Sequence, residues 1–102
     1  MIFYGGLYYN VYKVIYYEKE VRSFLKKGKI TLEIFKRFDN AFIALEATKD
    51  LSLFDIKRLK GSASRNYYRL RKGKYRAIFY LENNDFHVII IAKREEVYDL
   101  WE

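Results

Sequence analysis

Residues 67–80, YYRLRKGKYRAIFY, alternate cationic and apolar side chains on both sides of one glycine. Side chains on a strand point to opposite faces in turn, so this pattern predicts a β-hairpin with one charged and one apolar face. We expect a two-residue turn at Lys72–Gly73. That turn pairs the cations across the hairpin: Arg71 with Lys74, and Arg69 with Arg76. The apolar face, which must pack against the core, holds Tyr68, Leu70, Tyr75, Ala77 and Phe79.

The rest of the chain predicts an α+β fold. Residues 11–18 are rich in β-branched and aromatic side chains, which indicates a strand. Helical spacing of apolar residues follows over residues 18–27 and 32–47, with Gly28 ending the first helix and Thr31 capping the second. A largely connecting loop over 49–66 then leads to strands at 67–71, 74–82 and 86–92. We expect a two-helix antiparallel hairpin packed on one face of an antiparallel β-meander.

The length of 102 residues suits one domain, with residues 1–10 as a possible N-terminal extension. The chain has no cysteine, and the run MIFYGGLYYNVYKVIYY lacks the basic start and cleavage site of a signal peptide. No stretch reaches the roughly 20 apolar residues needed to span a bilayer. We therefore expect a soluble cytoplasmic protein with no membrane partner, no metal and no cofactor.

The net charge of +7 favours an anionic partner, and the charge is unevenly distributed. Residues 56–81 contain nine Lys or Arg residues and neither Asp nor Glu. A solvated surface normally mixes charges, so a phosphate-binding surface explains this run better than an ordinary exposed hairpin. The natural phosphate source is a nucleic-acid backbone, and a tyrosine such as Tyr67 or Tyr98 can stack on an unpaired base. The RNA-binding candidates are Lys57, Arg58, Lys60, Arg65, Tyr67, Lys72, Lys74 and Lys93.

Residues 59–100 resemble the C-terminal half of the RelE/ParE toxin superfamily. The resemblance rests on a leucine-lysine-glycine turn at 59–61, a Y-R-[IL]-R-x-G-x-Y-R-like hairpin at 68–76, and an apolar strand at 88–92. A closing K-R-x-x-V-Y motif follows at 93–98. The expected order of strand, two helices and sheet is similar to that family as well. The resemblance extends over about residues 11–100 and implies a RelE-like fold.

The resemblance also implies a function. RelE-type toxins belong to toxin–antitoxin pairs and cleave mRNA in the ribosomal A site, where the 2′-hydroxyl attacks the adjacent phosphate. The implied partners are mRNA, the ribosome and a cognate acidic antitoxin. The implied catalytic residues are Arg69, Arg71, Arg76, Arg94 and Tyr98. Fixed cations suit this reaction because negative charge builds up on the phosphate in the transition state.

The sequence departs from the best-known family pattern at two positions. Lysines stand in that pattern where this chain has Arg69 and Arg71, and arginine does not serve as a general base because it stays protonated. The base is therefore open among side chains near Arg94: Lys93, Glu95, Glu96 and Tyr98. Two other functions also stay open: a ParE-like inhibitor of DNA gyrase, and a non-catalytic RNA-binding module.

Overall fold

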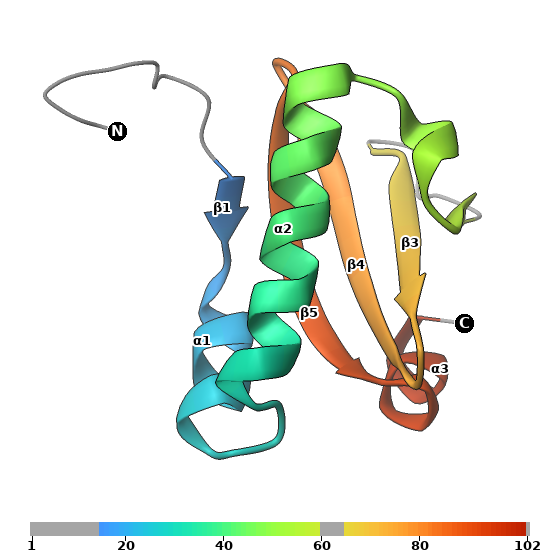
Figure 1. Ribbon diagram of the computed structural model, residues 1–102. Coiled ribbons are helices and arrows are strands. Elements are labelled where there is room, and N and C mark those ends of the chain that lie inside the picture. Colours follow the sequence, from blue (N-terminus) through green and yellow to red (C-terminus); the bar gives the residue numbers. More distant parts are fainter. Residues whose placement is uncertain (1–14, 60–64, 102) are drawn as a thin grey trace, which may run out of the picture.

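The computed structural model describes residues 15–59 and 65–101, without the side chains of residues 99 and 100 (Figure 1). The elements in chain order are β1 (Ile15–Tyr17), α1 (Lys19–Lys26), α2 (Leu32–Thr48), the 3₁₀ helix η2 (Leu51–Leu53), β2 (Ile56–Arg58), β3 (Tyr67–Lys72), β4 (Tyr75–Glu82), β5 (Asp85–Lys93) and α3 (Arg94–Trp101). The predicted α+β class and element order are confirmed. The possible extension at 1–10 and the start of the strand expected at 11–18 lie outside the described residues.

The two predicted helices form where the capping signals placed them. Gly28 follows α1 with a φ of 75°, a left-handed conformation that glycine adopts without a steric penalty. Thr31 is the N-cap of α2, and its side chain accepts a hydrogen bond from the backbone N–H of Ile34 at 3.1 Å. The chain reverses between α1 and α2 (Figure 1). Within the part of the chain that the structure describes, no helix is long and apolar enough to cross a membrane.

The sheet has five strands in the order β1-β5-β4-β3-β2. The strands from β2 to β5 pair antiparallel, as the predicted meander requires, while β1 joins the edge by pairing parallel with β5. The segment predicted as loop contributes more structure than expected, because it forms η2 and the edge strand β2. Strand β2 holds only three residues, too few for a recognisable alternation.

Helix α2 covers one face of the sheet (Figure 1). The buried ring of Phe42 packs against Phe79 of β4 and Phe86 of β5, with ring centroids 5.2 and 5.7 Å apart. The hydroxyl of Tyr17 on β1 donates a hydrogen bond to Asp39 of α2 at 2.6 Å. Burial, and then the Asp39 carboxylate, raise the pKa of Tyr17. Side chains on this face of the hairpin therefore face the core.

The opposite face of the sheet is partly covered by α3, a helix that we did not predict. Its Trp101 ring lies 5.2 Å from the ring of Tyr67, and its Val97 is buried.

Strand β5 also contains a bulge, since Ile78 pairs with Ile90 while Phe79 pairs with Val88. Regular pairing from a two-residue turn at Asn83–Asn84 would place Ile91 opposite Arg76 and Ile89 opposite Ile78, but the bulge shifts both pairs by one residue. Arg76 lies opposite Ala92, and Ile78 lies opposite Ile90.

Candidate active site

The hairpin of β3 and β4 presents the arginines on the face away from α2. Directly paired residues share a face, and Arg71 pairs with Arg76 while Arg69 pairs with Ile78. The predicted separation into a cationic and an apolar face is therefore correct, but the predicted pairing is wrong. The turn is Gly73–Lys74, because Lys72 pairs with Tyr75. Two pairs of opposed cations were expected within the hairpin, where the structure has one, Arg71 with Arg76; another, Lys57 with Arg69, lies between β2 and β3.

The turn explains the changed register. Gly73 has a φ of 60°, whereas Lys74 has no positive φ. A two-residue hairpin turn with glycine at its first central position is a common solution, because it matches the twist of the strands. The sequence RKGK allows glycine at either central position, so alternation alone did not decide between them. Both turns preserve the same alternation, which is why the faces were predicted correctly.

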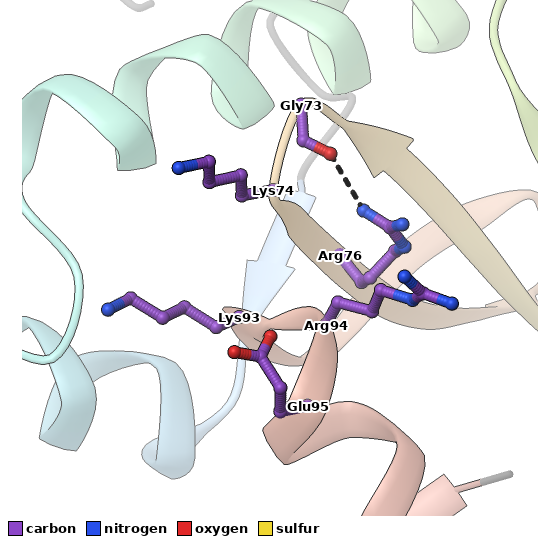
Figure 2. Close-up of a pocket in the computed structure, with 6 residues that line it drawn as sticks. All are labelled: Gly73, Lys74, Arg76, Lys93, Arg94 and Glu95. Carbon is purple, nitrogen blue, oxygen red and sulfur yellow. Dashed lines mark hydrogen bonds between the residues drawn. The ribbon is translucent and has the colours of Figure 1, made fainter.

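Arg76 is the buried centre of the cationic face. Its exposed fraction is only 8%. Its Nη1 atom donates to the backbone carbonyl of Gly73 at 2.9 Å (Figure 2) and to that of Tyr75 at 3.0 Å. Burial lowers the pKa of Arg76, and the nearby charges of Arg69, Arg71 and Arg94 lower it further. Arginine nevertheless stays charged at neutral pH. The fold thus holds a fixed cation among other cations, an arrangement that an anion would stabilise.

Helix α3 brings the C-terminal motif to the same place. The backbone N–H of Arg94 donates to the carbonyl of Lys74 in the hairpin turn at 3.0 Å, which fixes the start of the helix. The Arg94 guanidinium lies 5.1 Å from the ring centroid of Tyr98, one helical turn further on. Tyr98 is 41% exposed, unusually open for a large aromatic residue. The other four predicted catalytic residues therefore gather around Arg76, although the catalytic roles of all five stay a prediction.

An acid that the sequence analysis did not consider also lies at this cluster. Asp55 precedes β2, one residue outside the acid-free run, and its Oδ2 atom lies 2.5 Å from Nε of Arg71. The backbone N–H of Arg71 donates to the Asp55 carbonyl at 2.9 Å. The acid-free run of residues 56–81 is therefore partly neutralised by the residue directly before it. Little in the sequence indicated the contact between Asp55 and Arg71, because it depends on the pairing of β2 with β3, which was not predicted.

A shallow pocket of about 480 Å³ opens at the tip of the hairpin. It is lined by Gly73, Lys74, Arg76, Lys93, Arg94 and Glu95. In Figure 2 the guanidinium groups of Arg76 and Arg94 lie on one side, while Lys74 and Lys93 extend toward the other. Lys93 pairs with Tyr75 and so belongs to the face that α2 covers. The pocket therefore offers cations from both faces of the sheet.

The remaining predicted RNA-binding residues do not form one patch. Lys57 pairs with Arg69 and lies on the cationic face. Arg58 and Lys72 lie on the other face: Arg58 pairs with Tyr68 and donates to Asn66 at 2.6 Å, and Lys72 lies 5.1 Å from the Phe54 ring centroid. The structure does not bring these two residues to the site.

Arg65 and Tyr67 lie at the far end of the hairpin from its turn. Arg65 stacks over the ring of Tyr80 at 4.1 Å, and Tyr67 packs between Tyr80 and Trp101. Tyr67 is thus occupied by protein rings, which leaves Tyr98 as the more open aromatic side chain. Lys60 lies outside the described residues. Among the residues that are described, no three His, Asp or Glu side chains form a group that could hold a metal.

Comparison with known proteins gives structural neighbours only. No family model matches the chain, and no curated protein matches its sequence. A solved RelB–RelE antitoxin–toxin complex from Methanococcus jannaschii contains a chain that is 25% identical, with a TM-score of 0.66, and the match covers 86% of this chain and 100% of that one. An archaeal RelE–RelB complex from Pyrococcus horikoshii OT3 matches at 22% identity and a TM-score of 0.62, over 80% and 94% of the two chains. These neighbours confirm the predicted RelE-like resemblance and fold.

Proposed function

From this RelE-like fold and the gathered basic residues, we propose that the chain is the toxin of a toxin–antitoxin pair and an endoribonuclease that cleaves mRNA. The reaction is attack of a 2′-hydroxyl on the adjacent phosphate, which yields a cyclic phosphate and a free 5′-hydroxyl. It takes place in the ribosomal A site in the cytoplasm and needs no metal. The structural neighbours, which are toxin–antitoxin complexes, support the toxin part of this proposal.

One observation carries the proposal. Arg69 and Arg71 of the hairpin come together around the nearly buried Arg76 with Arg94 and Tyr98 of α3, which follow about 20 residues later in the sequence. A fold gains nothing in stability from gathering cations, because like charges on opposed strand positions are destabilising. An anion bound at the cluster would offset this repulsion between the cations. Preorganised cations are also what a phosphate needs when charge accumulates on it in the transition state.

The residues divide into roles by their surroundings. Arg76 is held by two carbonyls and so offers a fixed charge to the scissile phosphate. Arg69, Arg71 and Arg94 add charge around it. Tyr98 is exposed and lies beside Arg94, where its ring can stack on an RNA base and orient the 2′-hydroxyl for in-line attack.

The candidates for the general base are not equally well placed. Glu96 pairs with Lys29 of the α1–α2 connection at 3.5 Å, away from the arginines. Glu95 lines the pocket with Arg76 and Arg94. Of the two carboxylates, Glu95 is the better candidate. Tyr98 on the same helix and Lys93, which also lines the pocket, are the alternatives. The arginines themselves stay protonated and act through charge alone.

A toxin of this kind requires a partner that silences it. We propose an acidic antitoxin whose helix or extended segment covers the cationic face of the sheet, since carboxylates can replace RNA phosphates on arginine. Electrostatic attraction between such surfaces also speeds their association.

The test is expression in a bacterial host with mapping of the new 5′ ends of cellular mRNA, while gyrase supercoiling is assayed in parallel. We expect cuts in phase with codons in translated messages, and none with the Arg76→Ala or Tyr98→Phe variant. Gyrase inhibition without mRNA cuts would instead establish the ParE-like function. RNA binding without either effect would leave a non-catalytic module.

A further inference from the structure

A salt bridge between Asp55 and Arg71 ties an arginine of the cationic cluster to a carboxylate at the edge of the sheet. The carboxylate Oδ2 lies 2.5 Å from Arg71 Nε. The backbones are joined as well, since the Arg71 N–H donates to the Asp55 carbonyl at 2.9 Å. Residue 55 is thereby aligned with residue 71 just beyond the paired residues Ile56 and Leu70. Asp55 is therefore held at the edge of the cluster by the sheet itself.

The geometry leaves part of the Arg71 guanidinium for another ligand. The contact to Asp55 engages Nε, whereas the planar guanidinium has a second edge made of its two terminal nitrogens. That edge can bind a phosphate in the two-bond arrangement typical of arginine. Arg71 lies directly opposite Arg76, so a phosphate at the terminal edge would lie close to the fixed charge of Arg76.

Without the salt bridge to Asp55, the Arg71 side chain would have little to hold it beside Arg76. Arg71 is 54% exposed, and the repulsion of Arg76, directly opposite, favours conformations that point away. Asp55 opposes that movement by holding Nε. A held guanidinium is already oriented where the phosphate gains charge, so its contribution is to the rate of the reaction rather than to binding.

We propose that Asp55 is a positioning residue of this site, which holds the Arg71 guanidinium so that its terminal edge faces the scissile phosphate. The inference rests on the proposed function and adds to it a residue that acts through another. Asp55 is not a proton acceptor in this account, because its carboxylate is engaged by Arg71.

The proposal predicts opposite effects on binding and on cleavage. Asp55→Asn removes a negative charge that repels RNA, so affinity for a fully 2′-O-methylated RNA, which cannot be cut, should hold or improve by up to about threefold. The cleavage rate on ribosome-bound mRNA should fall about tenfold, because a misplaced catalytic group costs rate rather than binding. Asp55→Glu, which keeps the carboxylate, should recover part of that rate.

The matched control is Glu33→Gln on α2. Glu33 also forms an exposed pair with an arginine, Arg37, at 3.5 Å, so this variant makes the same charge change away from the site. We expect less than a twofold change in its rate. A double-mutant cycle then tests the link itself: in the Arg71→Gln background, Asp55→Asn should change the rate less than about twofold.

Three results would overturn the inference. The first is an Asp55→Asn protein that cuts mRNA as fast as the wild type. The second is a loss of rate that persists in full in the Arg71→Gln background, which would indicate a direct role of Asp55 as acid or base. Equal losses of binding and rate would indicate general damage to the fold. If the wild-type protein cuts no mRNA, both the proposed function and the positioning role are rejected. If the wild type cuts mRNA and any of those three results is found, only the positioning role is rejected.

Discussion

Replacing Arg76 by methionine should reveal the electrostatic cost of the cationic cluster. The substitution keeps a long, flexible side chain at a position that is only 8% exposed, and it removes the charge that Arg69, Arg71 and Arg94 surround. The variant loses two hydrogen bonds to backbone carbonyls, at 2.9 and 3.0 Å, which cost about 1–3 kcal/mol of unfolding free energy together. Against this loss, it relieves the repulsion between the arginines.

The repulsive contribution can be bounded from the pairing. Arg71 lies directly opposite Arg76, and an opposed like-charge pair costs up to about 1 kcal/mol. The other two cations are less closely aligned and add a few tenths each, so the total is about 1 kcal/mol at low salt. Raising NaCl from about 0.1 to about 1 M shortens the screening length from about 10 to about 3 Å. This weakens the repulsion, though less than between two exposed charges, because Arg76 is nearly buried.

The assay is urea unfolding at several NaCl concentrations, because urea itself carries no charge. The wild type should gain up to about 0.5 kcal/mol of unfolding free energy relative to Arg76→Met between the two salt concentrations, so the stability difference between the two proteins widens. Arg37→Met is the matched control, since Arg37 attracts Glu33 at 3.5 Å. For Arg37→Met, salt should reduce the difference in unfolding free energy from the wild type, by about 0.3–0.5 kcal/mol at most, because it screens this attraction. A difference for Arg76→Met that stays constant or narrows with salt would refute the reasoning.

Three further predictions concern the fold that supports the site. Tyr17→Phe removes the hydrogen bond to Asp39. Because folding raises the pKa of Tyr17, the stability that this hydroxyl contributes to the wild type is complete below about pH 10 and declines above it. Urea unfolding at several pH values should show this decline in the wild type and not in the variant. Phe42→Ala should cost about 3–5 kcal/mol of unfolding free energy, measured by urea unfolding, since the ring packs against two buried phenylalanines. Thr31→Ala should cost about 1 kcal/mol by loss of its cap on α2, and an unchanged melting temperature would contradict that role.

Much of the fold was predictable because strong local signals agreed with the final packing. Glycine and threonine fixed the boundary between the helices, and alternation fixed which hairpin side chains face the core. The paired asparagines at 83 and 84 adopt positive φ values of 54° and 67°, as a tight turn between β4 and β5 requires. Each of these signals acts within a few residues, so tertiary contacts had little to override.

The unpredicted features depend on contacts between distant segments. The bulge in β5 lies within a run of apolar residues, where periodicity gives no indication of an extra residue. Helix α3 has only eight residues, and its packing signal is the spacing of Val97 and Trp101, which was not recognised. Asp55 reaches Arg71 because β2 pairs with β3, and a strand of three residues leaves almost no pattern. The candidate residues were thus predictable, but their mutual arrangement was not.

The most direct test of the central claim is cleavage by the purified protein of mRNA bound in programmed ribosomes, with analysis of the product ends. The account predicts a 2′,3′-cyclic phosphate and a 5′-hydroxyl, no cleavage when the scissile nucleotide carries a 2′-O-methyl group, and no cleavage by Arg76→Ala. Cleavage that persists with the 2′-O-methyl nucleotide, or intact mRNA under conditions where an established RelE toxin cuts it, would contradict the account.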